Sequence, residues 1–299
     1  MKIPSFLQPN DKIAIVATAR KATTKDLQEA LLLIKQWGLQ PVIGTSIGIE
    51  DHQFAGSDEE RAKDLQQQLD NPAIKAIWCA KGGYGTVRIL DLLDFSKFKE
   101  NPKWIIGYSD VTALHSHIHN LNIATLHAQM CIGVETKTEE SRETLRKAIF
   151  GEAIQYKFPF SKHNKLGTAK GEIVGGNLSV LFSLCGSNSA INTDGKILFI
   201  EDLDEYLYHI DRMMQNLKRN GMLKNLAGLV IGGMSDMNDN TIPFGKTAEE
   251  IIYETVKAYN YPVAFNFMAG HIENNQAIIL GKTVHLQVTE STSTLAYLK

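Results

Sequence analysis

The first half of the chain alternates short runs of β-branched residues with segments of helical periodicity. This alternation is typical of a parallel sheet covered by helices on both faces. Glycine- and proline-containing turns separate the segments. We therefore predict an α/β fold over residues 1–150, with strands at 12–19, 40–45, 73–80 and 104–110 and helices at 24–38 and 57–71.

The pattern changes after residue 136, where a charged helix is followed by a polar stretch without a strong period. We place a domain boundary there, because 299 residues are about twice the usual size of a single domain. Beyond it, residues 168–299 carry many short apolar runs and few helices. The sequence therefore predicts a second domain that is rich in β-structure and has a mixed sheet.

Composition excludes several classes of partner. The formal net charge is only -2, so no field attracts nucleic acid or an anionic membrane. No apolar run approaches the ~20 residues that span a bilayer, and we see no secretory signal, so we expect a cytoplasmic protein. The cysteines are Cys79, Cys131 and Cys185, an odd number that argues against a disulfide framework.

The stretch WIIGYSDVT at 104–112 places Ser109 where a parallel strand turns into a helix. Backbone N–H groups at a helix N-terminus are unpaired and would stabilise an oxyanion formed beside the serine. The pattern is not the hydrolase elbow G-x-S-x-G, because Val111 stands where that motif has glycine. The alternative is that Ser109 or Asp110 only caps the helix.

The stretch KGGYG at 81–85 also follows a strand, at the sheet edge where open α/β sheets bind ligands. Its glycines let the backbone approach a ligand and present N–H groups to an anion. The spacing fits neither G-x-G-x-x-G nor a Walker loop, so we expect no nucleotide cofactor. We expect this stretch to bind a ligand beside Ser109 on one edge of the sheet. The alternative is that it is only a tight turn.

A nucleophilic serine needs a base, and nine histidines are available. His115 and His119 are four apart on a helix, but no third zinc ligand accompanies them, so we expect no metal site. His271 follows the apolar run 262–270 and precedes a polar loop, which places its ring at the lip of a sheet.

The acid that orients such a histidine should stand on a rigid element. Glu201 ends the apolar run KILFI and begins the acidic run EDLDE. Asp202, Asp204 and Glu205 compete for the role, and a solvated acidic turn is the alternative. Spacing alone does not select Glu201 and His271.

Several ordered motifs together resemble a known family: AKGGYG at 80–85, GYSDVTALH at 107–115, GGNLS at 175–179, ILFIEDLDEYLYHIDRM at 197–213 and AGH at 269–271. They resemble the LD-carboxypeptidase family of serine peptidases, which also contains the microcin-C immunity peptidases. The resemblance runs from about residue 12 to residue 286. It implies a flavodoxin-like or glutamine-amidotransferase-like N-terminal domain, a β-rich C-terminal domain and an active site between them.

The resemblance also implies a catalytic triad, which maps onto Ser109, Glu201 and His271. It implies that the substrate is a murein tetrapeptide, cut between an L-centre diamino acid and the terminal D-alanine in cell-wall recycling, and that the protein is a homodimer. Our candidates for the oxyanion hole are the backbone N–H groups of Asp110 and Gly83.

We expect Lys81 and Gly82 to contact the substrate. Lys81 stands where many relatives carry arginine, and lysine lacks the bidentate fork, so selectivity could shift if this residue meets a substrate carboxylate. Ile279 stands where relatives often carry proline. Neither departure touches the triad.

Three alternatives remain. A microcin-C-like immunity peptidase would cleave an amide that joins an acidic amino acid to a nucleotide-like group. A degenerate peptide-binding module would keep the fold without turnover. A simple α/β-hydrolase esterase is disfavoured by the missing glycine after Asp110.

Overall fold

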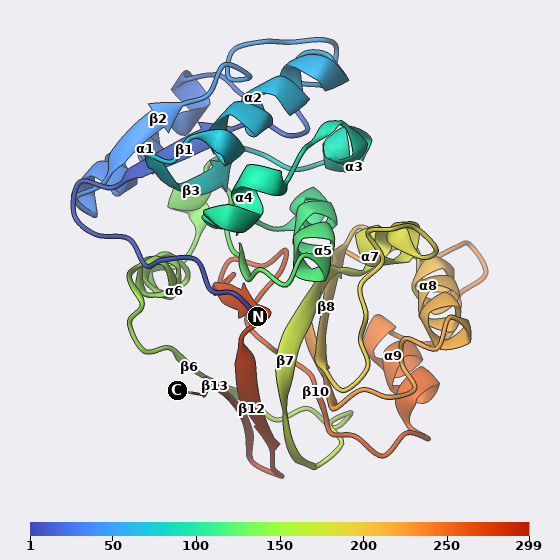
Figure 1. Ribbon diagram of the computed structural model, residues 1–299. Helices are drawn as coiled ribbons and strands as arrows, with labels where there is room; N and C mark the ends of the chain where they lie inside the picture. The colour runs from blue at the N-terminus through green and yellow to red at the C-terminus, as the bar shows by residue number, and fades with distance from the viewer. Residues whose placement is uncertain (299) are drawn as a thin grey trace.

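The computed structural model describes residues 1–298, which form two lobes (Figure 1). The first lobe contains the blue segments and most of the green ones, and the second contains most of the yellow, orange and red ones. Helix α5 (Thr112–Asn120) lies at the junction, where it packs against strand β7 (Gly167–Asn177) of the second lobe.

The sheet of the first lobe has the order β11-β5-β4-β3-β1-β2 over the described chain. Strands β1 to β5 are parallel and follow the spatial order 2-1-3-4-5 of flavodoxin-like folds, as predicted. Strand β11 is antiparallel and comes from the second half of the chain. The bounds are β1 Lys12–Val16, β2 Gln40–Ile43, β3 Ile74–Cys79, β4 Trp104–Gly107, β5 Thr125–His127 and β11 Ile278–Leu280.

Helices cover both faces of this sheet, because alternate residues of the strands enter two different cores. In β1, Ile13 and Ile15 pack in one core with helices α1 and α6, while Ala14 and Val16 pack in another with α2, α4 and α5. The other bounds are α1 Gln28–Gln36, α2 Asp58–Asp70, α3 Thr86–Ile89, α4 Ser96–Glu100 and α6 Glu139–Phe150, with short 3-10 helices η1 Lys25–Leu27, η2 Leu90–Leu92, η3 Ser109–Val111 and η4 Val134–Thr136.

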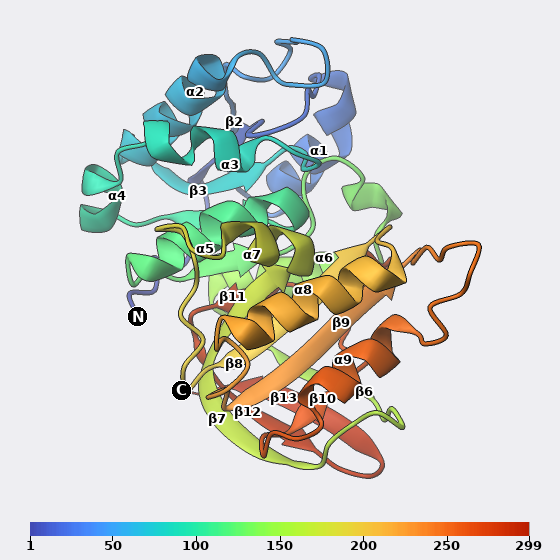
Figure 2. The ribbon, with the colours of Figure 1, turned by 90° about the vertical axis from the view of Figure 1, so that its right-hand side faces the viewer.

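The sheet of the second lobe has the order β10-β9-β8-β7-β12-β13-β6 within residues 1–298. Strands β7 to β10 are parallel and the others are antiparallel, so the predicted mixed sheet is confirmed. Helices α7, α8 and α9 lie together on one face (Figure 2). The bounds are β6 Gln155–Pro159, β8 Ile197–Leu203, β9 Gly228–Ser235, β10 Val263–Ala264, β12 Thr283–Val288, β13 Thr292–Tyr297, α7 Leu178–Leu184, α8 Leu207–Arg219 and α9 Ala248–Val256.

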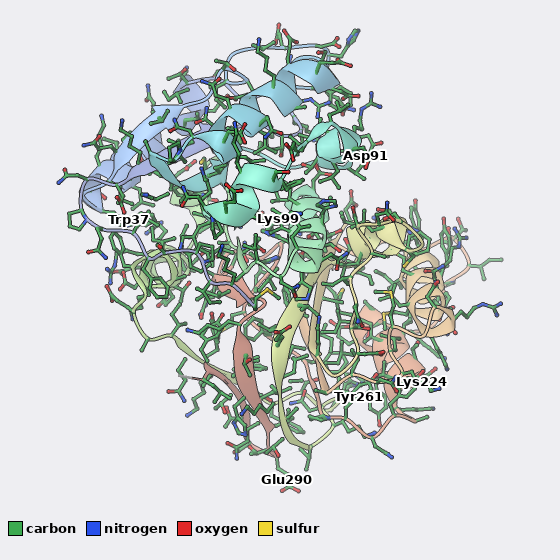
Figure 3. All side chains as sticks on the ribbon, viewed as in Figure 1. Trp37, Asp91, Lys99, Lys224, Tyr261 and Glu290 are labelled. Carbon is green, nitrogen blue, oxygen red and sulfur yellow. The ribbon has the colours of Figure 1, made fainter. Side chains whose placement is uncertain are left out.

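The two lobes are joined by more than one crossing of the chain. Strand β11 pairs with β5 of the first sheet, and the chain then returns to the second sheet as β12. The turn between β12 and β13 carries Glu290, which lies at the end of the second lobe farthest from the first (Figure 3). In the part of the chain described, no helix is long and apolar enough to cross a membrane.

Two local predictions were wrong: the pattern of 170–186 predicts a strand, a glycine turn and a helix, and the apolar run 262–270 predicts a strand. Gly175 and Gly176 do not form a turn: β7 runs through both as far as Asn177, with φ of +125° and +145°. The backbone of β8 explains them, because a Cβ on Gly175 would lie 1.9 Å from the Phe199 carbonyl oxygen. The apolar run 262–270 forms only the short strand β10, and the rest is an irregular segment that leads to His271.

The Gly175→Ala substitution is expected to lower the free energy of unfolding by roughly 3 kcal/mol or more, since it adds backbone strain to an overpacked contact. The matched control is Gly195→Ala, at a position with φ of +70° and no atom within 4 Å of an added Cβ. There we expect a cost of about 1–2 kcal/mol from the left-handed conformation alone. Urea denaturation of both variants measures the difference, and equal costs would contradict the packing explanation.

Candidate active site

A cleft of about 610 Å³ lies where the carboxyl ends of parallel strands from both lobes meet. Segments that follow β1, β3, β4 and β5 form one wall, and segments at the ends of β7 and β8 form the other, together with His271. The lining residues are Arg20, Lys81, Gly82, Gly83, Tyr108, Ser109, Asp110, Gln129, Met130, Ile132, Asn177, Ser179, Val180, Asp202, Leu203, Asp204, Glu205 and His271.

Ser109 stands on a sharp turn between β4 and the helical segment η3–α5, as the sequence predicted. Its φ of +59° lies in the left-handed region, which is costly for a residue with a Cβ. The turn is tight because Gly107 precedes it: a Cβ on Gly107 would lie 2.8 Å from Cγ2 of Val111. This strained elbow presents the Ser109 side chain to the cleft.

The side chain of Asp110 joins the elbow to the glycine turn. It is buried and accepts a hydrogen bond of 2.8 Å from the backbone N–H of Thr86, the first residue of α3. Asp110 therefore caps a helix, but not the helix that it begins. Within residues 1–298, the backbone N–H groups of Asp110 and Gly83 donate to no protein acceptor, so both are free for a ligand.

Glu201 and His271 form a buried pair. Oε2 of Glu201 lies 2.7 Å from Nδ1 of His271 and also accepts the backbone N–H of His271 at 3.1 Å. The Glu201 side chain is 0% exposed and lies behind the histidine, whereas the His271 side chain is 13% exposed and reaches the cleft. Spacing alone left four acids open and the family resemblance implied Glu201, and the structure places Glu201 against the ring.

Local backbone features bring this pair together. The pairing of β8 with β9 slips between Ile200 and Asp202, so that β9 has an extra residue opposite Glu201. The segment that carries His271 crosses at this point, where the N–H of Gly233 donates to the carbonyl of Ala269. Gly270 has φ of +104°, and a Cβ there would lie 2.6 Å from Oε2 of Glu201, so the close approach requires glycine.

The environment of His271 sets its protonation. Burial lowers the pKa of His271, but the hydrogen bond and charge of Glu201 raise it, and the net result is a pKa above the usual 6.5. The ring of Tyr108 packs on the imidazole, with 4.8 Å between centroids. Behind Tyr108 lies His127, whose complete burial lowers its pKa well below 6.5, so it is neutral.

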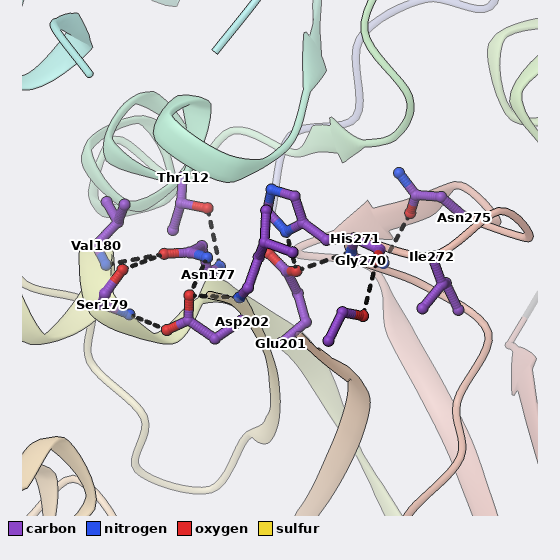
Figure 4. A network of polar contacts seen from close by, with 12 residues as sticks. Thr112, Asn177, Ser179, Val180, Glu201, Asp202, Gly270, His271, Ile272 and Asn275 are labelled. Atoms are coloured by element: carbon purple, nitrogen blue, oxygen red, sulfur yellow. Dashed lines mark hydrogen bonds and ion pairs between the residues drawn. The ribbon is translucent and has the colours of Figure 1, made fainter. Parts of the chain in front are cut away.

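Asp202 and Asn177 form a second polar network beside the pair (Figure 4). Asp202 accepts hydrogen bonds from Nδ2 of Asn177 at 2.8 Å and from the backbone N–H of Ser179 at 2.9 Å. Burial and the neighbouring charge of Glu201 raise the pKa of Asp202 to about 7. The Asn177 side chain also caps α7 by accepting the N–H of Val180, and its backbone N–H donates to the hydroxyl of Thr112 in the first lobe at 3.0 Å.

The Ser109 hydroxyl and the His271 ring line the same cleft, and among residues 1–298 no hydrogen bond joins them. Such catalytic contacts are often long without substrate and tighten when it binds. Lys81, Gly82 and Gly83 line the cleft as predicted. Asn177 and Arg20 were missed as site residues, although Arg20 follows strand β1 at the same ligand-binding edge of the sheet.

Two histidines on α5, His115 and His119, have structural contacts instead of lining the cleft. His115 is buried with Nε2 2.8 Å from the carbonyl oxygen of Gly107, and His119 lies 2.7 Å from Nζ of Lys196. Over the described residues, no group of three histidine, cysteine or acidic side chains gathers in a geometry that could hold a metal ion.

Two family models match the chain. The LD-carboxypeptidase N-terminal domain matches residues 13–128, and the LD-carboxypeptidase C-terminal domain matches residues 170–286. The chain belongs to the LD-carboxypeptidase family. The resemblance found in the motifs is therefore confirmed; the N-terminal match falls on the first lobe, and the C-terminal match covers the second lobe together with strand β11 of the first sheet.

Relatives of known name include the "Probable murein peptide carboxypeptidase" of Bacillus subtilis, which is 33% identical over 98% of this chain and 93% of the relative. The "Murein tetrapeptide carboxypeptidase" of Pseudomonas aeruginosa is 27% identical over 94% of both chains. A solved structure of the microcin C7 self immunity protein MccF in complex with aspartyl sulfamoyl adenosine shares the fold, with a TM-score of 0.87 at 21% identity over 100% of this chain and 99% of that one.

The Glu201→Gln substitution is expected to move the pKa of His271 from above 6.5 to below it. Burial, which lowers the pKa, stays in the variant, while the negative charge that raises it is lost. An NMR titration of the His271 ring, assigned by comparison with His271→Gln, measures both midpoints. A midpoint that stays above 6.5 in Glu201→Gln would show that another group holds the proton.

Proposed function

We propose that this protein is a serine peptidase that removes the terminal D-alanine from murein tetrapeptides. One observation carries the proposal: in a chain of the LD-carboxypeptidase family, Ser109 on a strained elbow and a histidine held by a buried glutamate line one cleft. The names of the relatives from B. subtilis and P. aeruginosa support the choice of substrate.

The proposed mechanism follows from the contacts of His271. Because Nδ1–H donates to Glu201, Nε2 is the free nitrogen and accepts the proton of the Ser109 hydroxyl. The serine oxygen attacks the amide carbonyl, and His271 then gives the proton to the nitrogen of the departing D-alanine. Water, deprotonated by His271, then attacks the acyl carbonyl, and His271 returns the proton to the Ser109 oxygen as the acyl group leaves.

The backbone N–H groups of Asp110 and Gly83 are the proposed oxyanion donors. They approach the serine from two directions, since Asp110 follows it in the chain and the glycine turn lies against it: a Cβ on Gly82 would be 3.5 Å from Cβ of Ser109. The hydrogen bond that the backbone N–H of Thr86 donates to Asp110 holds the two segments together. Each such donor is typically worth about 3 kcal/mol of transition-state stabilisation.

We also propose that the protein acts in the cytoplasm, in cell-wall recycling, as a homodimer. The free thiols of Cys79 and Cys131 are buried, and Cys185 is partly buried, which suits a reducing compartment. The mass from multi-angle light scattering tests the dimer.

The first activity test is D-alanine release from a murein tetrapeptide by the purified protein, beside Ser109→Ala. We expect release by the wild type and a loss of at least about 10³-fold in the variant, because no other nucleophile stands on the elbow. A structural control is the melting temperature of Ser109→Ala, which should not fall, since alanine keeps the fold. Release by both proteins would mean that Ser109 is not the nucleophile.

No release by either protein would favour one of the two remaining functions. Aspartate released from aspartyl sulfamoyl adenosine would then identify an immunity-type peptidase. Calorimetric binding of the tetrapeptide without turnover would instead identify a peptide-binding module.

A further inference from the structure

Arg20 is a cation on the cleft wall for which the mechanism above has no use. It lies just after β1, it is exposed, and it lines the cleft. Within residues 1–298 its guanidinium has no ion pair and donates no hydrogen bond. We propose that Arg20 binds the terminal carboxylate of the substrate, an inference that rests on the proposed function.

The backbone and the glycine turn fix where Arg20 lies. Its main chain pairs with Phe54 in an isolated antiparallel bridge, and its neighbour Ala19 accepts the N–H of Ala55 at 3.1 Å. Its side chain lies over Gly83, where an added Cβ would be 2.3 Å from Nε of Arg20. Two features therefore disfavour a side chain at position 83: its φ of +104° is strained for a residue with a Cβ, and Arg20 occupies the space that the Cβ would need.

A carboxypeptidase constrains the position of its carboxylate-binding group. The scissile carbonyl and the terminal carboxylate are one residue apart, and one residue spans at most about 3.6 Å. The cation must therefore lie beside the oxyanion donors. Contacts lead directly from the nucleophile to Arg20: Gly82 lies against Ser109, Gly83 follows it, and Arg20 covers Gly83.

The distribution of charged residues favours the same wall of the cleft for binding a carboxylate. Asp204 and Glu205 line the opposite wall, where their carboxylates disfavour an anion, whereas the acid of the first wall, Asp110, is buried and accepts the N–H of Thr86. The cations on the first wall are Arg20 and Lys81.

The charge of Lys81 also acts on a neighbouring acid, Asp26. Hydrogen bonds from Thr23 and the charge of Lys81 lower the pKa of Asp26. Neither cation forms an ion pair within residues 1–298, but the planar fork of Arg20 matches a carboxylate with two parallel hydrogen bonds, whereas Lys81 presents a point charge. Arg20 is therefore the specificity-determining residue, and Lys81 adds long-range attraction.

The test compares two substrates, a murein tetrapeptide with a free terminal carboxylate and the same peptide with a terminal carboxamide. For the wild type we expect kcat/KM to be about 10–100-fold higher for the acid, since a hydrogen-bonded ion pair is lost in the amide. In Arg20→Met this ratio should fall to within about two-fold of one. Arg20→Lys should keep an intermediate ratio, because the charge stays and the fork is lost.

Two controls separate Arg20 from its surroundings. Lys21→Met removes the same charge from the next residue, which pairs with Glu50 outside the cleft, and should leave the ratio unchanged. Lys81→Met should lower kcat/KM for the acid but keep a ratio above that of Arg20→Met. Melting temperatures of all variants confirm that the fold is kept, as expected for exposed side chains.

The outcomes distinguish this inference from the proposed function. If the wild type cleaves neither peptide, the proposed function fails. If the wild type prefers the acid and Arg20→Met keeps that preference, the assignment of Arg20 is overturned while the function stands. If Lys81→Met, and not Arg20→Met, abolishes the preference, Lys81 is the carboxylate-binding residue.

Discussion

The hydrogen bond between Glu201 and His271 is the interaction on which the architecture of the cleft depends. A carboxylate that is 0% exposed is costly to bury unless it is paired, and this one is paired with both the ring and the backbone N–H of His271. Several unusual features of the second lobe serve this contact. Among them are the register slip between β8 and β9 and the glycine at position 270.

The position of the cleft follows from a simple property of parallel sheets. Most side chains that line the cleft come from the carboxyl ends of parallel strands or from the segments that follow them, and these ends lie along one edge of each sheet. The lobes pack so that the two edges face each other across α5, with Thr112 of one lobe bonded to Asn177 of the other. Ser109 from the first lobe and His271 from the second can therefore line one cleft.

Much of this arrangement could be predicted locally. The elbow at Ser109 and the helix predicted at 57–71 depend on residues close in the chain, and both are confirmed; that helix begins with a capping box of Ser57 and Glu60. Predictions failed where a distant segment decided the conformation. Gly175 and Gly176 look like a turn in sequence, yet they continue a strand because the backbone of β8 lies where a Cβ would be.

The sequence by itself determined the fold class and the family, because hydrophobic periodicity and ordered motifs are properties of neighbouring residues. Spacing alone left four acids as possible partners of His271, the family resemblance singled out Glu201, and neither gave a role to Arg20. Only the tertiary structure shows the contact of Glu201 with the His271 ring and the Arg20 side chain over Gly83. The physical reason is distance along the chain: contacts between residues tens of positions apart depend on sheet register and on the packing of the two lobes, which no local pattern encodes.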